Sequence, residues 1–437
     1  QDNTMNKTFK TKQYKNLNFQ LLALPDTNYF KIEVVNKLGA DAERTYLKKT
    51  GENIFGLSHL VEHLSFKTSK DYSTEELLKL LKSEGIFNAS TDFDRINYFF
   101  ETSMDKLNLG TKLIFNCALN TLLKVSQEDF ETEKLVVTNE IKRYFDDDQT
   151  MFHLSIPSSL LDLDKNDNIL GSPETIKEVT LKQSQSLKSF FLNEGENFFN
   201  ITYDPTILTE LEVLEAVYSE YIKFEKQPSA EYPITAIEVK EDLKQPIKNN
   251  RIKLDSEAEQ SLTYFNFDIF KNSFVSVVGN LYIRELSKTS LNDLIREQNG
   301  LTYGVHLDED RMAGNHYIDF FCDVSKGTED KLFELFNESI TESSKNFTEE
   351  LYFTLMKSEK VKRNLSFMNL KAHNGWFWDQ LWLPEELTDF KDLLEEDIIK
   401  VYDKIDEEIV TFSAVKAYLD SFAEKVNNKD FKVITSY

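Results

Sequence analysis

The chain has 437 residues, of which 40% are hydrophobic and 13% aromatic, and its formal net charge is -24. It exceeds the roughly 250–300 residues at which a single core stops growing, and its apolar content excludes a disordered chain, so two folded domains are expected. The acidic balance excludes nucleic acid and anionic membrane surfaces as main partners, because binding there depends on Lys and Arg displacing counterions.

The N-terminal stretch, residues 1–15, is polar and lacks the apolar centre of a signal peptide. No apolar run approaches the roughly 18 residues of a membrane span, so a soluble chain without membrane insertion is expected. Because the chain starts at Gln1 rather than Met, removal of a leader sequence remains an alternative. The compartment is therefore not assigned, although the cytoplasm is slightly favoured. Cys117 and Cys322 each lie in an apolar stretch, which favours free buried thiols over a disulfide.

The first half of the chain alternates short aliphatic and aromatic runs, typical of strands, with longer stretches of helical period. In chain order we predict strands over 18–24 and 30–36, helices over 55–66 and 74–83, two strands within 87–101, helices over 104–125 and 127–145, a helix ending near 191, a strand over 200–203 and a helix over 209–224. Ser73, with Glu76 three residues later, forms a capping box for the helix that Gly85 closes.

The chain is predicted to divide into a first domain, 1–225, a linker, 226–250, and a second domain, 251–437. The linker is charged, contains several prolines and has no helical period. Both halves repeat one order of features, in which a helix closed by Gly85 or Gly300 precedes a turn, an apolar strand and a further helix, at an offset of roughly 215–225 residues. We therefore predict an α+β fold of two homologous domains, each a mostly antiparallel sheet packed with helices.

A metal-binding pattern lies on the helix predicted over 55–66. His59 and His63 are four residues apart, so both imidazoles project from one helix face and can bind one cation, with Glu62 beside them. Zinc takes nitrogen from His and oxygen from carboxylate, and a catalytic site has three protein ligands plus water, so one more ligand is needed. The alternative for the two histidines is a place in the core with ordinary hydrogen bonds.

The helix predicted over 127–145 offers candidates for the third ligand. Glu133 and Glu140 are seven residues apart and therefore lie on nearly the same face. Either carboxylate could reach a metal held by the histidines. The alternative for each, taken alone, is a solvated position on the helix surface.

The order His-x-x-Glu-His, followed by a glutamate after about 76 residues, resembles the pitrilysin–insulysin family of inverzincin peptidases, which includes the mitochondrial processing peptidase. Residues 64–139 lie between His63 and Glu140 and match that spacing. The resemblance implies that His59, His63 and Glu140 bind one Zn²⁺ per chain. It also implies the duplicated αβ unit of the insulinase and processing-peptidase type.

The resemblance assigns roles to the two remaining glutamates. Glu62 is implied as the general base, which takes a proton from the water that zinc activates and passes it to the leaving amine. Glu133 takes the place of the family's additional glutamate, which lies next to the metal ligands.

The resemblance also extends to substrate binding. The segment Asn88-Ala89-Ser90-Thr91 resembles the family's strand whose edge pairs with the bound peptide. Arg296 and Tyr303 lie in a segment similar to the family's Arg…Gly-Leu-x-Tyr, whose Arg and Tyr contact the substrate near the scissile bond. These two residues are therefore implied to bind substrate or stabilise the transition state.

Together these likenesses imply a zinc-dependent metalloendopeptidase that degrades or processes extended or unstructured peptides. Residues 1–225 are implied as the catalytic domain, and 251–437 as a non-catalytic domain that contributes substrate-binding residues. Because the family's chamber is built from four such domains, a homodimer or a heterodimer with a related subunit is implied. The alternatives are a non-enzymatic core or assembly subunit that keeps the peptidase fold, and a storage or regulatory zinc protein. Glu62 and the open coordination position favour the enzyme.

Overall fold

The structure is a computed structural model that describes residues 8–160, 163–164, 166–224, 232–233, 251–254, 260–269, 274–312, 315–367, 411–429 and 431–436. Contacts divide these residues into two compact units, and each is described by itself. Unit 1 holds the described residues up to Asp146 and those from Asn166 to Pro233, and unit 2 holds the rest. The predicted linker, 226–250, lies outside the described residues except for Tyr232 and Pro233.

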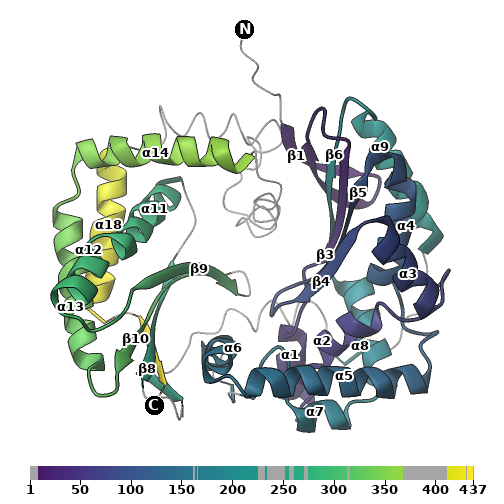
Figure 1. The fold of residues 1–437 in the computed structure, drawn as a ribbon, viewed down its shortest axis with the longest axis horizontal. Helices are drawn as coiled ribbons and strands as arrows, with labels where there is room; N and C mark the ends of the chain where they lie inside the picture. Colours follow the sequence, from purple (N-terminus) through teal and green to yellow (C-terminus); the bar gives the residue numbers. More distant parts are fainter. Residues whose placement is uncertain are drawn as a thin grey trace. The chain divides into compact units, whose positions relative to one another are not determined.

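Unit 1 is built on a six-stranded sheet (Figure 1). In spatial order its strands are β1 (Thr8–Tyr14), β2 (Leu17–Ala23), β6 (Asn197–Tyr203), β3 (Tyr29–Asn36), β5 (Ile96–Ser103) and β4 (Ile86–Thr91). Neighbouring strands are antiparallel except for β2 and β6, which are parallel. Strand β4 lies at one edge, so its outer backbone groups are not paired within this sheet.

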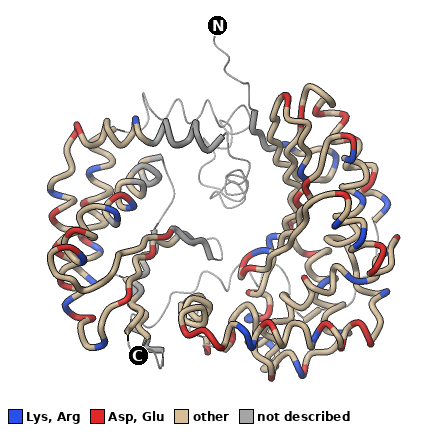
Figure 2. The backbone as a smooth tube through the Cα atoms, in the orientation of Figure 1, with Lys and Arg blue, Asp and Glu red and all other residues tan. Residues whose placement is uncertain are grey.

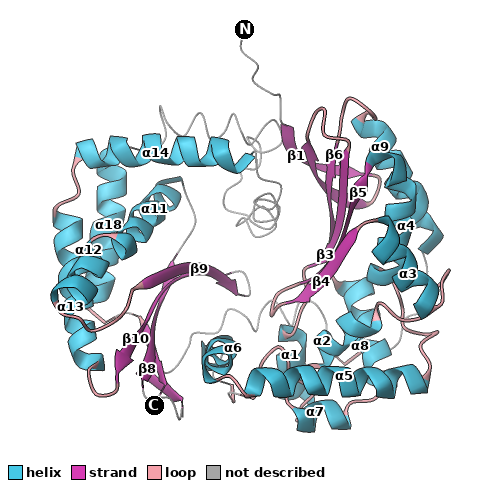
Figure 3. Cartoon of the chain, viewed as in Figure 1, coloured by secondary structure: helices cyan, strands magenta, loops and turns pink. Residues whose placement is uncertain are grey.

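The helices of unit 1 are α1 (Asp41–Thr50), α2 (Leu57–Leu64), α3 (Thr74–Glu84), α4 (Leu107–Ala118), α5 (Gln127–Phe145), α7 (Pro173–Glu178), α8 (Leu181–Glu194) and α9 (Glu210–Tyr221). Helices α3, α4 and α9 lie along one side of the sheet (Figure 3). Capping boxes begin α3, α7, α8 and α9, at Ser73, Ser172, Thr180 and Thr209. The local sequence therefore specifies where these helices start.

Most predicted elements of unit 1 are confirmed, but two helix predictions are wrong. The stretch 104–125 is a 3-10 turn followed by α4, which ends at Ala118, because Leu122 has a positive φ of 64° that a right-handed helix does not allow. The helix ending near 191 is in fact two helices, α7 and α8, since Val179 and Thr180 between them are extended. The sequence patterns did not indicate α1 or β1, whose residues are mostly polar.

Unit 2 has a five-stranded sheet in the order β7 (Arg251–Leu254), β11 (Lys432–Ser436), β8 (Gln260–Ile269), β10 (Asn315–Ser325) and β9 (His306–Met312). Its helical elements are α6 (Asp148–Leu160), α11 (Phe274–Lys288), α12 (Ser290–Asn292), the π-helix η3 (Asp293–Gln298), α13 (Glu329–Lys345), α14 (Glu349–Phe367) and α18 (Phe412–Asn427). Helix α6 belongs to this unit although it precedes α7 in the chain, and its His153 packs edge-on against Phe321 of β10 at 5.3 Å between ring centroids.

The two sheets share one topology. In each, a parallel pair (β2 and β6, or β7 and β11) is followed by three antiparallel pairings that end in an edge hairpin (β5 and β4, or β10 and β9). Strand β4 begins at Ile86 and β9 at His306, so the repeat has the predicted offset. The predicted fold class is confirmed: this is an α+β protein with two related domains.

Phenylalanine fills both cores. In unit 1 Phe19 and Phe115 pack against Phe199, and in unit 2 Phe265 and Phe267 stack on Phe336. The two cysteines are buried and free, as the sequence predicts. Acidic residues are spread over the helices of both units (Figure 2). Within the described part of the chain, no helix is long and apolar enough to cross a membrane.

Candidate metal centre

Helix α2 presents the histidine pair. It begins after Gly56, whose φ of 91° favours glycine and where a Cβ would lie 2.4 Å from the carbonyl oxygen of Leu170. Its apolar side chains are fully buried: Leu57, Leu60, Val61 and Leu64. This packing fixes the rotation of the helix, and His59, Glu62 and His63 project together from its remaining surface.

Helix α5 presents the two candidate carboxylates. Its first turn is capped by Ser126, whose hydroxyl accepts the backbone N–H of Asp129, and Phe130, Val137 and Ile141 anchor it in the core. Glu133 and Glu140, seven residues apart, both face the histidines of α2.

Three side chains converge on one point. The Nε2 atoms of His59 and His63 are 3.2 Å apart, and Oε2 of Glu140 lies 3.8 Å from the first and 3.4 Å from the second. Among the described residues, this is the group of His, Cys, Asp and Glu side chains whose ligand atoms could hold one metal ion. A tetrahedral ion with bonds of roughly 2.0–2.1 Å places its ligand atoms about 3.3 Å apart, so the spacing fits zinc.

Glu133 orients the second histidine. Its Oε1 lies 2.9 Å from Nδ1 of His63, and its Oε2 is 2.5 Å from Nζ of Lys67. If Nδ1 carries the proton and donates to Glu133, the lone pair of Nε2 faces the cluster, as a metal ligand requires. By contrast, the buried Nδ1 of His59 has no hydrogen-bond partner among the described residues.

The electrostatics of the cluster follow from burial and these contacts. Burial lowers the pKa of His59 to about 4. Burial also acts to lower the pKa of His63, but hydrogen bonds to Glu133 and Glu140 outweigh it and raise that pKa to about 9. The hydrogen bond to His63 lowers the pKa of Glu140. The cluster therefore favours ionised carboxylates that attract a cation.

Glu62 lies beside the cluster and contacts strand β4. Its Oε2 accepts a hydrogen bond of 2.6 Å from Oγ1 of Thr91. Burial raises the pKa of Glu62, while the hydrogen bond from Thr91 acts against the rise. A carboxyl with a raised pKa beside a group of metal-ligating side chains is suited to proton transfer.

The structure brings one end of the segment 88–91 to the cluster. Thr91 reaches Glu62, whereas Ser90 turns to Asn97 and Asn88 bonds to the backbone N–H of Ala89. All four residues lie on β4, one of the two edge strands of unit 1.

Arg296 and Tyr303 lie together in unit 2. The guanidinium of Arg296, on η3, is 4.9 Å from the centroid of the Tyr303 ring, and Tyr303 is 85% exposed. These two residues are thus adjacent in unit 2, whereas the histidine and glutamate cluster belongs to unit 1.

Sequence reasoning missed a buried lysine next to α2. Lys188 of α8 is 2% exposed, and its Nζ donates to Oγ of Ser65 at 3.0 Å and to the hydroxyl of Tyr98 at 3.3 Å. Burial lowers the pKa of Lys188 to about 7. One sequence feature could have predicted its burial: it lies among the apolar residues Leu187, Phe190 and Phe191, which are all buried on the same helix.

The lowered pKa of Lys188 predicts that the free energy of unfolding rises with pH. Between pH 7 and about 10 the unfolded chain keeps the proton on this amine and the folded chain does not, so raising the pH stabilises the fold. Relative to Lys188→Met, the metal-free wild type should gain about 1.5 kcal/mol of unfolding free energy between pH 7 and 8.5. Urea unfolding at both pH values measures this. If the difference in unfolding free energy between the two proteins were the same at pH 7 and pH 8.5, Lys188 would be protonated in the folded protein at both pH values.

Residues 49–174 match the sequence profile of a family described as Insulinase (Peptidase family M16). The chain is 31% identical over 125 residues to the zinc protease PqqE of Helicobacter pylori, covering 28% of this chain and 26% of that protein. It is 24% identical over 304 residues to the probable zinc protease PqqL of Haemophilus influenzae, covering 64% of this chain and 31% of that protein. The matches thus span about a quarter to a third of the length of these relatives.

Solved structures share the fold over the whole chain. A protease from Helicobacter pylori has a TM-score of 0.75 at 16% identity, covering 99% of this chain and 100% of that one. An inactive domain of an M16 peptidase from Pseudomonas fluorescens scores 0.72 at 14% identity, with 98% of each chain covered. Pitrilysin scores 0.69 at 17% identity, covering 99% of this chain and 45% of that one.

The family profile covers α2 and α5, which carry the histidine and glutamate cluster. The solved structures cover both units. The predicted resemblance is therefore confirmed: residues 49–174 are similar in sequence to the insulinase peptidases of family M16, and the fold is similar to that of pitrilysin.

Proposed function

We propose that this chain is a zinc-dependent endopeptidase that cleaves extended or unstructured peptides. One observation carries the proposal: His59, His63 and Glu140 converge with the spacing of a tetrahedral site, and Glu62 lies next to them. Three ligands leave one coordination position open, which is typical of a catalytic rather than a structural zinc.

His59, His63 and Glu140 hold the metal. When bound, zinc lowers the pKa of a water molecule toward 7 and polarises the scissile carbonyl. Glu62 accepts the proton of the attacking water and passes it to the leaving amine. Glu133 keeps His63 in the tautomer and orientation that binding needs.

Strand β4 binds the substrate by pairing with its backbone. Its free edge can accept one more strand, and a peptide that adds there must offer unpaired backbone groups, so folded proteins are poor substrates. The contact from Thr91 to Glu62 supports this role, because it joins the end of the binding edge to the general base.

The family resemblance assigns Arg296 and Tyr303 of the second domain to substrate binding or to stabilisation of the transition state. An arginine next to an exposed tyrosine supplies donors for the negative charge that develops on the tetrahedral oxygen.

The chain acts as a dimer, either with itself or with a related subunit. Light scattering at micromolar concentration tests this, and a monomer would contradict it.

A non-enzymatic subunit is the competing function, and the likeness to an inactive M16 domain favours it. The set of residues argues for the enzyme, since a scaffold has no need for a buried carboxyl beside three metal-ligating groups. A storage protein is disfavoured because three protein ligands leave one coordination position open, as in a catalytic site.

Metal analysis together with peptide hydrolysis tests the proposal. Purified protein is expected to contain about one zinc per chain and to cleave a quenched library of unstructured peptides, with activity lost on chelation and restored by zinc. Bound zinc without cleavage of any peptide would instead support the non-enzymatic subunit. Absence of bound zinc would contradict the proposed metal site itself.

A further inference from the structure

The N-terminus of helix α2 is capped by a buried carboxyl from another helix. Glu43 of α1 is 0% exposed. Its two carboxyl oxygens accept the backbone N–H of Gly56, at 3.1 Å, and that of Ser58. Gly56 occupies the cap position and has no side chain to accept these protons, so Glu43 supplies the acceptors that a helix start requires.

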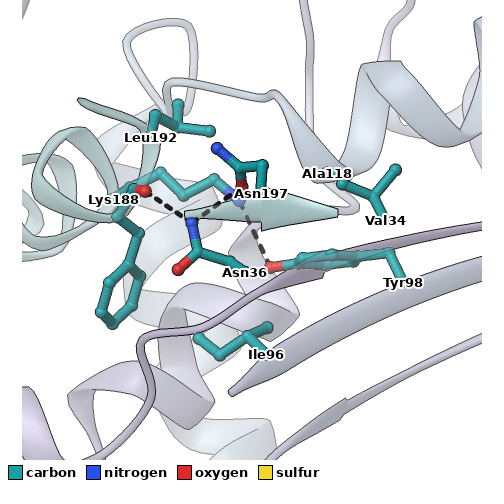
Figure 4. Close-up of a pocket in the computed structure, with 9 residues that line it drawn as sticks. Val34, Asn36, Ile96, Tyr98, Ala118, Lys188, Leu192 and Asn197 are labelled. Atoms are coloured by element: carbon teal, nitrogen blue, oxygen red, sulfur yellow. Dashed lines mark hydrogen bonds between the residues drawn. The ribbon is translucent and has the colours of Figure 1, made fainter. Parts of the chain in front are cut away.

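The C-terminus of the same helix is held by the buried amine of Lys188. Ser65 is the C-terminal cap residue of α2, and its hydroxyl donates to the carbonyl oxygen of Val61 at 2.8 Å. Lys188 donates to that hydroxyl and to Tyr98 on β5, which ties the helix end to the sheet. Figure 4 shows the lysine side chain reaching Tyr98 within a small pocket.

Both groups are costly to bury, so stability alone does not account for them. Replacing a whole buried ion pair with apolar residues of similar volume is often neutral or stabilising, so buried charged groups are weak evidence for a role in stability. What such groups do provide is placement, because hydrogen bonds to fixed partners have direction and apolar contacts do not. Here both sets of bonds end on the helix that carries His59 and His63.

We propose that Glu43 and Lys188 are positioning residues for the metal site. They fix the two ends of α2, so that the imidazoles of His59 and His63 keep the separation a single metal ion needs. This inference rests on the proposed metal site and names residues that act on it without touching the metal. At eight residues, α2 is too short to be stable as an isolated helix, so its ends depend on contacts with the rest of the domain.

The chain offers matched controls on β3. Glu33 is also 0% exposed and accepts hydrogen bonds from the side chains of Asn97 and Asn200. Lys31 is 4% exposed and lies 3.9 Å from Glu101. Glu33→Gln and Lys31→Met therefore make the same two side-chain replacements at similarly buried positions on the sheet.

The test compares zinc affinity in Glu43→Gln and Lys188→Met with that in the two controls, by competition with a chromophoric chelator at pH 7. Gln keeps one acceptor but turns an amide N–H₂ toward a backbone donor, and Met is close to Lys in length, so both variants should fold. Circular dichroism checks this. We expect about 10-fold weaker zinc binding in each variant, and less than about 2-fold change in the controls.

Cobalt substitution gives a readout that a purely structural role would not move. The visible absorption of bound Co²⁺ reports ligand geometry, and it should shift in the two α2 variants and stay constant in the controls. Wild-type affinity and spectrum in both variants would overturn the inference, whereas a wild type that binds no metal would overturn the proposed function instead. If Glu43→Gln does not fold, Lys188→Met and Ser65→Ala still decide the C-terminal anchor.

Discussion

Replacing Glu62 with Gln is expected to reduce peptide hydrolysis by about 10³-fold while zinc stays bound at one ion per chain. The amide has nearly the shape of the carboxylate and still accepts the hydrogen bond from Thr91, so the helix and its ligands should not move. It cannot accept a proton from water, and general-base catalysis by a positioned side chain contributes about 10²–10⁴-fold. The measurement is kcat on a quenched unstructured peptide, with zinc determined in the same sample.

A matched control separates base catalysis from loss of charge. Glu128 is exposed on the first turn of α5, and Glu128→Gln removes the same charge from the domain. This variant should retain wild-type turnover. If Glu62→Gln also retained turnover, Glu62 would not be the base. If Glu62→Gln lost its zinc, its loss of activity would say nothing about proton transfer.

The histidine pair and the register of the two glutamates were predictable because their geometry is local to one helix. His59 and His63 share a helix face by virtue of the helical period, and the same period places Glu133 and Glu140 in register on α5. That α5 lies against α2 is a tertiary fact, and only the resemblance to a known family supplied it. Residue spacing alone left both glutamates open.

The supports of the cluster were not predictable from the sequence. Glu43 caps a helix that begins 14 residues later, and Lys188 reaches Ser65 from a helix 123 residues away. Neither contact has a local pattern, because a buried charge is recognised only once its surroundings are known. For the same reason the sequence does not indicate α1. Its charged residues Asp41 and Arg44 are typical of a solvent-exposed helix, but both are buried, and Nε of Arg44 lies 2.7 Å from Oδ1 of Asp41.

Element types were more predictable than element ends. Capping boxes set the starts of α3, α8 and α9, but no local sequence pattern marks the end of α4 at Ala118, ahead of Leu122 with its positive φ. Likewise, nothing in the sequence of α6 indicates that it packs with unit 2, since its contact with Phe321 joins residues far apart in the chain. The predicted boundary at residue 225 stays a prediction.

Replacing Glu140 with Gln is expected to weaken zinc binding by roughly a thousandfold. Structural zinc sites bind with about 10–16 kcal/mol, so losing one charged ligand of a set costs about 4 kcal/mol. Glu133→Gln is the matched variant, with the same chemistry on the same helix seven residues earlier, and it contacts His63 rather than the metal. It should cost only about 10–100-fold.

The order of these two effects decides which glutamate is the ligand. Chelator competition at pH 7 measures both affinities on one scale, and peptide hydrolysis at saturating zinc shows whether either variant is still active when loaded. Glu133→Gln should regain most of its activity under that condition, because its three ligands are intact. If instead Glu133→Gln lost more affinity than Glu140→Gln, Oε1 of Glu133 would be the ligand. His63 would then bind the metal through Nδ1 instead of Nε2. In that case the sequence spacing from His63 to Glu140 would have identified the residue that supports the site and not the ligand.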